Sequence, residues 1–274
     1  MRFKKLGKSN LKISSIGLGG LSQFHGEGCR IAGYCRDMET ERLSFKWKHF
    51  KQSIILMAAR WYLAYAISYR DIEELMAERG VKVDHSTVNR WVIEYAPQLE
   101  TEFRKKHKAQ VGCSWRADET YVKIKGQWNY LYRAVDKEGN TVDFYLSKNR
   151  DKLAAEAFFR KAIGDNMLPE KVVIDKSGAN KAALDSLNLQ LALLFLMTGI
   201  LMPILIRQIK YLNNIVEQDH RAIKKIINPM KGFKSFAAAK ATLAGIELHH
   251  MLRKGQYANA ANMAVYEQFY ALAA

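Results

Sequence analysis

The spacing of apolar residues changes near residue 115, and this change constrains the fold of the 274-residue chain more than any other feature. From Phe45 to about residue 100, apolar residues recur every three or four positions, which is typical of amphipathic helices. Between residues 115 and 149 they alternate with polar residues, which is typical of strands. The pattern predicts a helical region followed by a region that contains strands.

The strand-rich region predicts a layered α/β domain. Alternating segments at residues 115–126, 127–139 and 140–149 predict successive antiparallel strands with glycine-containing turns between them. The elements predicted after them are a helix at 151–164, a short strand at 171–175, and helices at about 179–187, from about 212, and at 237–255. Strands followed by helices in this order favour helices packed on a sheet.

The helical region predicts a helix-turn-helix. Ser68 caps a helix that Gly80 ends, and Asp84 caps a second helix that stops before Pro97. The second helix is expected to show outward the residue types that read base edges or hold phosphates, namely His85, Thr87, Asn89, Arg90 and Glu94. An ordinary helical hairpin with a solvated face is the alternative.

The charge of the chain indicates a polyanionic partner. Lys and Arg number 43 against 27 Asp and Glu, a net charge of +16, which suits nucleic acid or an anionic membrane surface. Residues 189–206 form an uncharged run that reaches the length of a membrane span. Gln190, Gly199 and Pro203 interrupt it, so we expect a buried element and no membrane partner. The basic N-terminus lacks the apolar stretch of a signal peptide.

Three carboxylates occupy positions that suit catalysis. Asp118 lies inside the first predicted strand, Asp175 ends the fourth at the edge where α/β sheets place ligands, and Glu217 lies on a late helix. Converging acids repel one another unless a cation relieves the repulsion, and Mg²⁺ prefers oxygen ligands. Two ions, both held by Asp118, would suit phosphodiester displacement. Taken singly, each acid is also explained as an edge-strand, capping or surface residue.

Basic residues follow Glu217 on the same predicted helix. His220, Arg221 and Lys224 come three, four and seven positions later, which places them on one polar face. We expect this face to contact DNA, with Lys224 on a phosphate.

Several segments resemble the DDE transposases of bacterial insertion sequences, family six. They are WRADETYVKIKG, VVIDKSGAN, QIKYLNNIVEQDHRAIKK and GFKSFAAAKATLAGIELHHMLRKGQ, and for the family's DNA-binding start WKHF, RWYLAYAISYRDIEELMAERG and VDHSTVNRWVIEYAP. The resemblance covers about residues 45–274. It implies an α/β, RNase H-like catalytic domain, with three antiparallel strands plus parallel strands flanked by helices, behind an all-α helix-turn-helix domain.

The resemblance also implies site residues, cofactors and partners. Asp118, Asp175 and Glu217 would be the metal-binding triad, with Lys224 as the basic residue after it. The implied reaction is Mg²⁺-dependent nicking at terminal inverted repeats and strand transfer by the freed 3′-hydroxyl, using two ions, with Mn²⁺ as a substitute. The implied partners are double-stranded DNA, as repeats and as target, and at least a second copy of the chain, at the nucleoid in the bacterial cytoplasm.

We therefore expect five parts along the chain. They are a non-family stub (1–43), a helix-turn-helix domain (44–100), a basic linker (101–112), a catalytic domain (113–256) and a C-terminal tail (257–274). The three cysteines are too few for a disulfide scaffold and indicate a reducing compartment. His25, Cys29 and Cys35 lack a fourth partner at a zinc-finger spacing, so no zinc site is expected.

Two departures from the family pattern leave an alternative open. Between Asp175 and Glu217 lie 41 residues, more than the family commonly has, and the surplus falls in the uncharged run. Residues 1–20 resemble the start of aldo/keto reductases, but no barrel follows; we expect a fusion to a reductase start codon, with Met38 as an internal start. These departures favour a catalytically inactive remnant that only binds DNA, whereas the intact triad favours the enzyme.

Overall fold

The computed structural model describes residues 3–5, 12–14, 43–176, 178–198, 203–209, 213–260 and 262–274. The chain divides into two compact units, Met1–Glu39 and Thr40–Ala274. In the first unit, β1 (Phe3–Lys5) pairs antiparallel with β2 (Lys12–Ser14). The zinc ligands considered above and Met38 lie outside the described residues.

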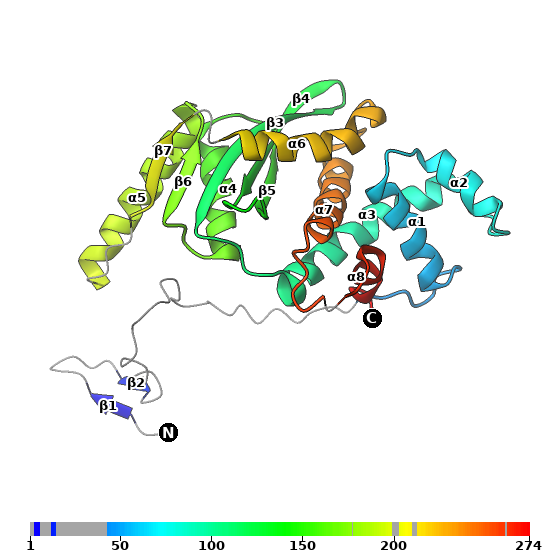
Figure 1. The fold of residues 1–274 in the computed structure, drawn as a ribbon, viewed down its shortest axis with the longest axis horizontal. Helices are drawn as coiled ribbons and strands as arrows, with labels where there is room; N and C mark the ends of the chain where they lie inside the picture. The colour runs from blue at the N-terminus through cyan, green and yellow to red at the C-terminus, as the bar shows by residue number, and fades with distance from the viewer. Residues whose placement is uncertain are drawn as a thin grey trace. The chain divides into compact units, whose positions relative to one another are not determined.

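The second unit begins with three helices (Figure 1), which are α1 (Gln52–Ala64), α2 (Tyr69–Ala77) and α3 (His85–Glu102). Both predicted caps are present. Ser68 Oγ accepts a hydrogen bond from the Asp71 N–H at 3.1 Å, and the Asp71 carboxylate accepts one from the Ser68 N–H at 2.7 Å. Asp84 Oδ1 accepts a hydrogen bond from the Ser86 N–H at 2.8 Å. These bonds satisfy amide groups that have no partner inside the helix, so they define where α2 and α3 begin.

The sequence predicted that α3 stops before Pro97, and this prediction is wrong. It continues to Glu102 and into a π-helical turn at Phe103–His107. Proline removes one N–H and therefore one helical hydrogen bond. Leu99 and Phe103 are both fully buried beyond the proline, and burial of such side chains stabilises more than one hydrogen bond does. The segment expected as a linker (101–112) therefore begins as helix.

A five-stranded sheet follows, in the order β5-β4-β3-β6-β7. Strand β4 pairs antiparallel with both β3 and β5, whereas β6 pairs parallel with β3 and β7 pairs parallel with β6. The strands are β3 (Ser114–Ile124), β4 (Gln127–Val135), β5 (Thr141–Ser147), β6 (Lys171–Ile174) and β7 (Leu205–Gln208). This combination of antiparallel and parallel strands is the RNase H-like fold that was predicted; only β7 was not foreseen.

Helices lie on both faces of this sheet (Figure 1). They are α4 (Lys152–Asn166), α5 (Gly178–Thr198), α6 (Asn214–Ile227) and α7 (Phe236–Arg253); the 3₁₀ turn η4 (Asn228–Met230) and α8 (Val265–Ala271) complete the chain. Trp115 and Tyr132 pack with α4 and α5 on one face. Val122 packs with α6 and α7 on the other. Because side chains alternate along a strand, Asp118 shares the face of Val122.

The uncharged run at 189–206 is not the buried element that was predicted. Helix α5 extends through it to Thr198, and Leu189, Leu193, Leu194 and Leu196 are each more than half exposed. The reason is length: a helix of 21 residues measures roughly 31 Å, whereas the four-residue strands β6 and β7 measure about 13 Å. No helix in the described part of the chain has the length and apolar character needed to cross a bilayer.

Helix α7 packs against α1 and α3 in a core that the helical region shares with the sheet. Gly245 lies at this contact. A Cβ atom there would lie 2.6 Å from the Leu63 methyl groups of α1 and 2.7 Å from the Ala96 Cβ of α3. The segment expected as a C-terminal tail also contributes, because Phe269 of α8 is buried in the same core.

Gly245→Ala is expected to lower the free energy of unfolding by about 1–3 kcal/mol, the usual effect of overpacking, although alanine is the better helix former. Gly164→Ala in α4 is the matched control, because a Cβ there meets nothing within 4 Å, and it should stabilise by up to about 1 kcal/mol. Chemical unfolding followed by circular dichroism measures both changes. Equal effects would contradict the close packing at Gly245.

Lys108 connects the end of the helical region to the sheet. Its Nζ donates hydrogen bonds to the Val142 carbonyl at 2.6 Å and to Asn166 Oδ1 at 2.5 Å. Burial, together with the nearby Arg104 guanidinium, lowers the pKa of Lys108 from 10.5 to about 7. The folded chain therefore favours the neutral amine at this position.

This shift predicts a pH-dependent stability. Between about pH 7 and pH 10.5 the unfolded chain binds a proton at Lys108 that the folded chain lacks, so the contribution of this residue to stability rises with pH. Lys108→Met is expected to remove that part of the rise, measured as the free energy of unfolding at both ends of the window. Lys137→Met, at an exposed lysine, is the control. The same pH dependence in both variants would contradict the assignment.

Candidate catalytic site

Asp118 and Asp175 lie just beyond the paired part of two neighbouring strands. Strands β3 and β6 are adjacent and parallel, and their last paired residues, Arg116 and Val173, come two positions before Asp118 and Asp175. Neighbouring strands lie about 4.8 Å apart, and paired residues point to the same face. Asp175 directly follows β6, at its carboxyl end. Two of the three predicted acids therefore follow the paired residues of β3 and β6 at equal distance along the two chains, and Asp175 lies at the carboxyl end of its strand, where open α/β sheets bind ligands.

Glu217 lies in the first turn of α6, which contacts β3 and β4 on the face that carries Asp118. Its side chain is exposed. Arg221, which is exposed, and Lys224, which is half-buried, follow one and two turns later on the same side of the helix. This side of α6 combines one acid with two bases, as the spacing predicted.

The donor set suits a hard divalent cation, because all three residues offer carboxylate oxygens. Their oxygens are not all within 4.8 Å of one another; among the described residues only Glu73, Asp84 and His85 meet that criterion. A two-ion site does not require it, because a single shared ligand can serve both ions, about 4 Å apart. Asp118 lies on β3, between the strand that ends at Asp175 and the helix that carries Glu217, which fits the shared ligand.

Arg133 lies directly opposite Asp118 on β4, and its side chain is fully buried. Its guanidinium donates two hydrogen bonds to Glu247 of α7, from Nε to Oε1 at 2.6 Å and from Nη2 to Oε2 at 2.9 Å. Nη2 also lies 2.7 Å from Oδ2 of Asp219 on α6. Burial opposes the charge, but the Glu247 and Asp219 carboxylates raise the pKa of Arg133. One guanidinium thus joins β4 to both helices.

Asp219 is shared among three basic side chains. Its Oδ1 lies 2.7 Å from His250 Nε2 and 2.6 Å from Lys254 Nζ, and its Oδ2 contacts Arg133. Burial disfavours the charged carboxylate, but the hydrogen bond with His250 and the charges of Arg133 and Lys254 hold the pKa of Asp219 well below its usual range. The ionised form of Asp219 therefore anchors α6 to α7.

His220 is buried, whereas the helical spacing predicted an exposed DNA contact. Its Nδ1 lies 3.3 Å from Nη1 of Arg133, and its Nε2 lies 3.3 Å from Oδ2 of Asp118. Successive helical residues are separated by about 100°, so the predicted face was roughly 100° wide, from His220 at one edge to Arg221 at the other. The packing of α6 on the sheet turns the His220 edge inward.

The helix-turn-helix residues differ in orientation. Arg90 is exposed and donates a hydrogen bond from Nη2 to Thr87 Oγ1 at 2.9 Å. Asn89 is half-buried; it hydrogen-bonds with the side chain of Tyr69 and lines a cleft of about 910 Å³ bounded by α2, α3 and the segment before α7. Glu94 pairs with Lys48 at 2.7 Å. Thr87 and Arg90 are therefore available at the outer surface of α3, whereas Asn89 already has a partner.

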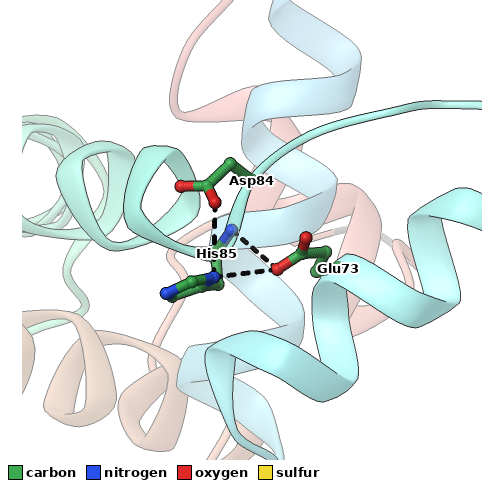
Figure 2. Close-up of side chains that lie close together, drawn as sticks. All are labelled: Glu73, Asp84 and His85. Atoms are coloured by element: carbon green, nitrogen blue, oxygen red, sulfur yellow. Dashed lines mark hydrogen bonds and ion pairs between the residues drawn. The ribbon is translucent and has the colours of Figure 1, made fainter.

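Figure 2 shows how Glu73 of α2 meets Asp84 and His85 at the start of α3. Glu73 Oε2 accepts a hydrogen bond from the His85 N–H at 3.0 Å and lies 2.9 Å from His85 Nδ1. Asp84 Oδ2 lies 3.4 Å from the same Nδ1. Acids at a helix N-terminus are stabilised by unpaired N–H groups and by the helix dipole. The cluster therefore ties α2 to the start of α3.

Sequence reasoning missed Arg133, Asp219 and Glu247. One signal was present, because Arg133 stands between Tyr132 and Ala134 in an alternating strand pattern. A charge within a buried strand requires a partner. The partner itself could not be identified, because Glu247 is 114 positions away in the sequence.

Comparisons with known proteins identify the family to which the chain is similar. Residues 112–256 match a family model described as a DDE domain. The chain is 45 % identical over 210 residues to the transposase for the insertion sequence-like element IS431mec of Staphylococcus aureus, covering 77 % of this chain and 88 % of that protein. The values are the same for the transposase of IS257 in transposon Tn4003 of S. aureus. The catalytic core of the HTLV-2 integrase, solved with magnesium, matches 59 % of this chain and 97 % of its own, with a TM-score of 0.37 and 16 % identity.

Glu247→Ala is expected to lower the free energy of unfolding by about 3–5 kcal/mol, because it leaves buried Arg133 with only part of its compensating charge. Glu247→Gln should cost less, since the amide oxygen still accepts a hydrogen bond. Glu170→Ala, at an exposed glutamate, should change stability by no more than about 0.5 kcal/mol. Chemical unfolding measures all three. A Glu247→Ala protein as stable as the Glu170→Ala protein would refute the role given to the buried pair.

Proposed function

Because the chain belongs to the DDE transposases of insertion sequences, we propose that it cuts DNA at the terminal inverted repeats of its own element and joins the ends to target DNA. Cutting by water frees a 3′-hydroxyl, which then attacks a target phosphodiester and displaces the target's 3′ oxygen. The observation that carries the proposal is the parallel pairing of β3 with β6, which ends two residues before Asp118 and Asp175, together with the packing of α6 against β3 and β4. The family relation supports a polynucleotidyl transferase in general, and the register supports these acids as its site.

In this proposal Asp118, Asp175 and Glu217 hold two Mg²⁺ ions, or Mn²⁺ in their place. When bound, such ions stabilise charge on the attacking and leaving oxygens. Asp118 would be the ligand shared by both ions, since β3 pairs with β6 on one side and contacts α6 on its face. Asp175 at the end of β6 and Glu217 on α6 each hold one ion. All three residues lie on or next to regular elements, which limits their movement.

DNA contacts are proposed on two surfaces. Arg221 and Lys224 lie on the side of α6 that carries Glu217, where they would neutralise phosphates near the reacting bond. Thr87, Asn89 and Arg90 are proposed to meet DNA from α3, with Asn89 exchanging its bond to Tyr69 for one to a base or phosphate. From residue 207 to residue 254 the sequence holds ten Lys and Arg against three acids, one of which is Glu217. His220, which is buried, is no longer proposed as a DNA contact.

The proposed reaction requires two element ends in one complex, so we propose at least a dimer. Both ends and the target are double-stranded DNA, which places the reaction at the bacterial nucleoid. The basic side chains of α6 would attract DNA of any sequence, whereas α3 would distinguish the terminal repeats from the target.

The test is strand transfer in vitro with the element's terminal repeats, a target plasmid and Mg²⁺. Asp118→Asn is expected to reduce joined product by more than about 100-fold, since even changes behind a metal ligand reduce activity 10–100-fold. Asp185→Asn, at an exposed acid of α5, is the matched control and should leave the yield unchanged.

Three outcomes separate the competing interpretations. Joined product from the wild-type and Asp185→Asn proteins, with none from Asp118→Asn, supports the transposase. Equal product from all three proteins would remove Asp118 from the site. Repeat-specific DNA binding without product from any of them would indicate the inactive remnant.

A further inference from the structure

His220 is the residue through which the buried charges reach the proposed site. It lies on α6, one turn after Glu217, and its ring fills the space between Arg133 and Asp118. Only 5 % of the residue is exposed, so it meets neither solvent nor DNA directly. A buried polar ring in this position must be explained by the contacts that it makes.

The two contacts define which ring nitrogen carries the proton. A guanidinium only donates hydrogen bonds, so Nδ1, at 3.3 Å from Arg133 Nη1, is an acceptor. The ring proton is therefore on Nε2, which is buried, makes no hydrogen bond within the described residues, and lies 3.3 Å from Asp118 Oδ2. Asp118 is the acceptor available to this N–H. A carboxylate has two oxygens, so one donor leaves room for a cation on Asp118.

Arg133 is in turn held in place from two sides. Glu247 of α7 accepts hydrogen bonds from Nε and Nη2, and Asp219 of α6, next to His220 in the sequence, lies 2.7 Å from the same Nη2. A planar guanidinium with three bonded neighbours has little freedom to rotate. Nδ1 of His220 therefore faces a donor, Nη1 of Arg133, whose position is fixed.

We propose that Arg133 and His220 are positioning residues for the metal site: Arg133 sets the orientation of the His220 ring, and His220 in turn sets the orientation of Asp118 and the rotation of α6 that presents Glu217. This inference rests on the proposed function, because it assumes that Asp118 and Glu217 are metal ligands. Groups that hold metal ligands by hydrogen bonds typically change metal affinity 10–100-fold when removed.

The test measures Mn²⁺ affinity of the full chain without DNA, by electron paramagnetic resonance of free Mn²⁺. His220→Asn retains an oxygen near the position of Nδ1 but cannot reach Asp118, and it should weaken Mn²⁺ binding by about tenfold or more. His220→Gln places an amide N–H near the position of Nε2 and should restore most of the affinity. Thermal unfolding of each variant identifies any loss of folded protein.

Two further variants complete the design. Arg133→Lys keeps a buried cation beside Glu247 but cannot bond Glu247, Asp219 and His220 together, so it should also weaken Mn²⁺ binding. His249→Asn removes another buried imidazole, whose ring packs on Phe269 of α8, and should leave Mn²⁺ affinity unchanged even where it lowers the unfolding temperature. It therefore controls for the general effect of losing a buried histidine.

The outcomes distinguish this inference from the proposed function. The positioning role is supported if folded His220→Asn binds Mn²⁺ weakly, His220→Gln restores most of the affinity, and His249→Asn binds Mn²⁺ as the wild-type protein does. Wild-type affinity in folded His220→Asn overturns it while leaving strand transfer by the wild-type protein intact. If Asp118→Asn binds Mn²⁺ as tightly as the wild-type protein does, the positioning role is also overturned. Mn²⁺ binding that depends on Asp118 and His220, in a protein that joins no DNA, would reject the transposase and retain the positioning role.

Discussion

The buried guanidinium of Arg133 is the interaction on which the arrangement of the catalytic region depends. A charge removed from water is strongly destabilising unless carboxylates meet it at hydrogen-bond distance. Arg133 has two, Glu247 from α7 and Asp219 from α6. Any shift of either helix along the sheet would separate these charges. The positions of α6 and α7 are therefore determined by electrostatics as well as by apolar packing.

The same interaction links the helix-turn-helix to the sheet. Helix α7, which carries Glu247, packs against α1 and α3 at Gly245, where no side chain larger than glycine's fits. Side chains from α1, α3, α7 and the sheet share one apolar core. Helix α3 and the sheet are thus parts of one compact unit, Thr40–Ala274. In a chain that must hold a DNA end near its acids, this packing limits relative movement of the two regions.

The long segment between Asp175 and Glu217 does not disturb the acids. It begins after β6 and ends before α6, so the register of β3 with β6 is unaffected by its length. Its described residues include α5, which is longer than the parallel strands, and β7 at the sheet edge. An insertion within β3 or α6 would have changed which side chains face the site.

Local patterns in the sequence determined much of this protein. The apolar spacing predicted most of the helices, the three antiparallel strands and β6. Ser68 and Asp84 marked the starts of α2 and α3, and short motifs identified the family. These features depend on neighbours a few positions apart, which periodicity and capping describe well.

Only the tertiary structure decided the rest. Helix α3 continues past Pro97 because side chains distant in the sequence bury Leu99 and Phe103. Several leucines of α5 are exposed because the helix is longer than the strands on which it packs. The tertiary structure also turned His220 from a predicted DNA contact into a neighbour of Asp118 and Arg133. The physical reason is common to all three: burial and ion pairing depend on residues far apart in the sequence, and local spacing cannot identify those partners.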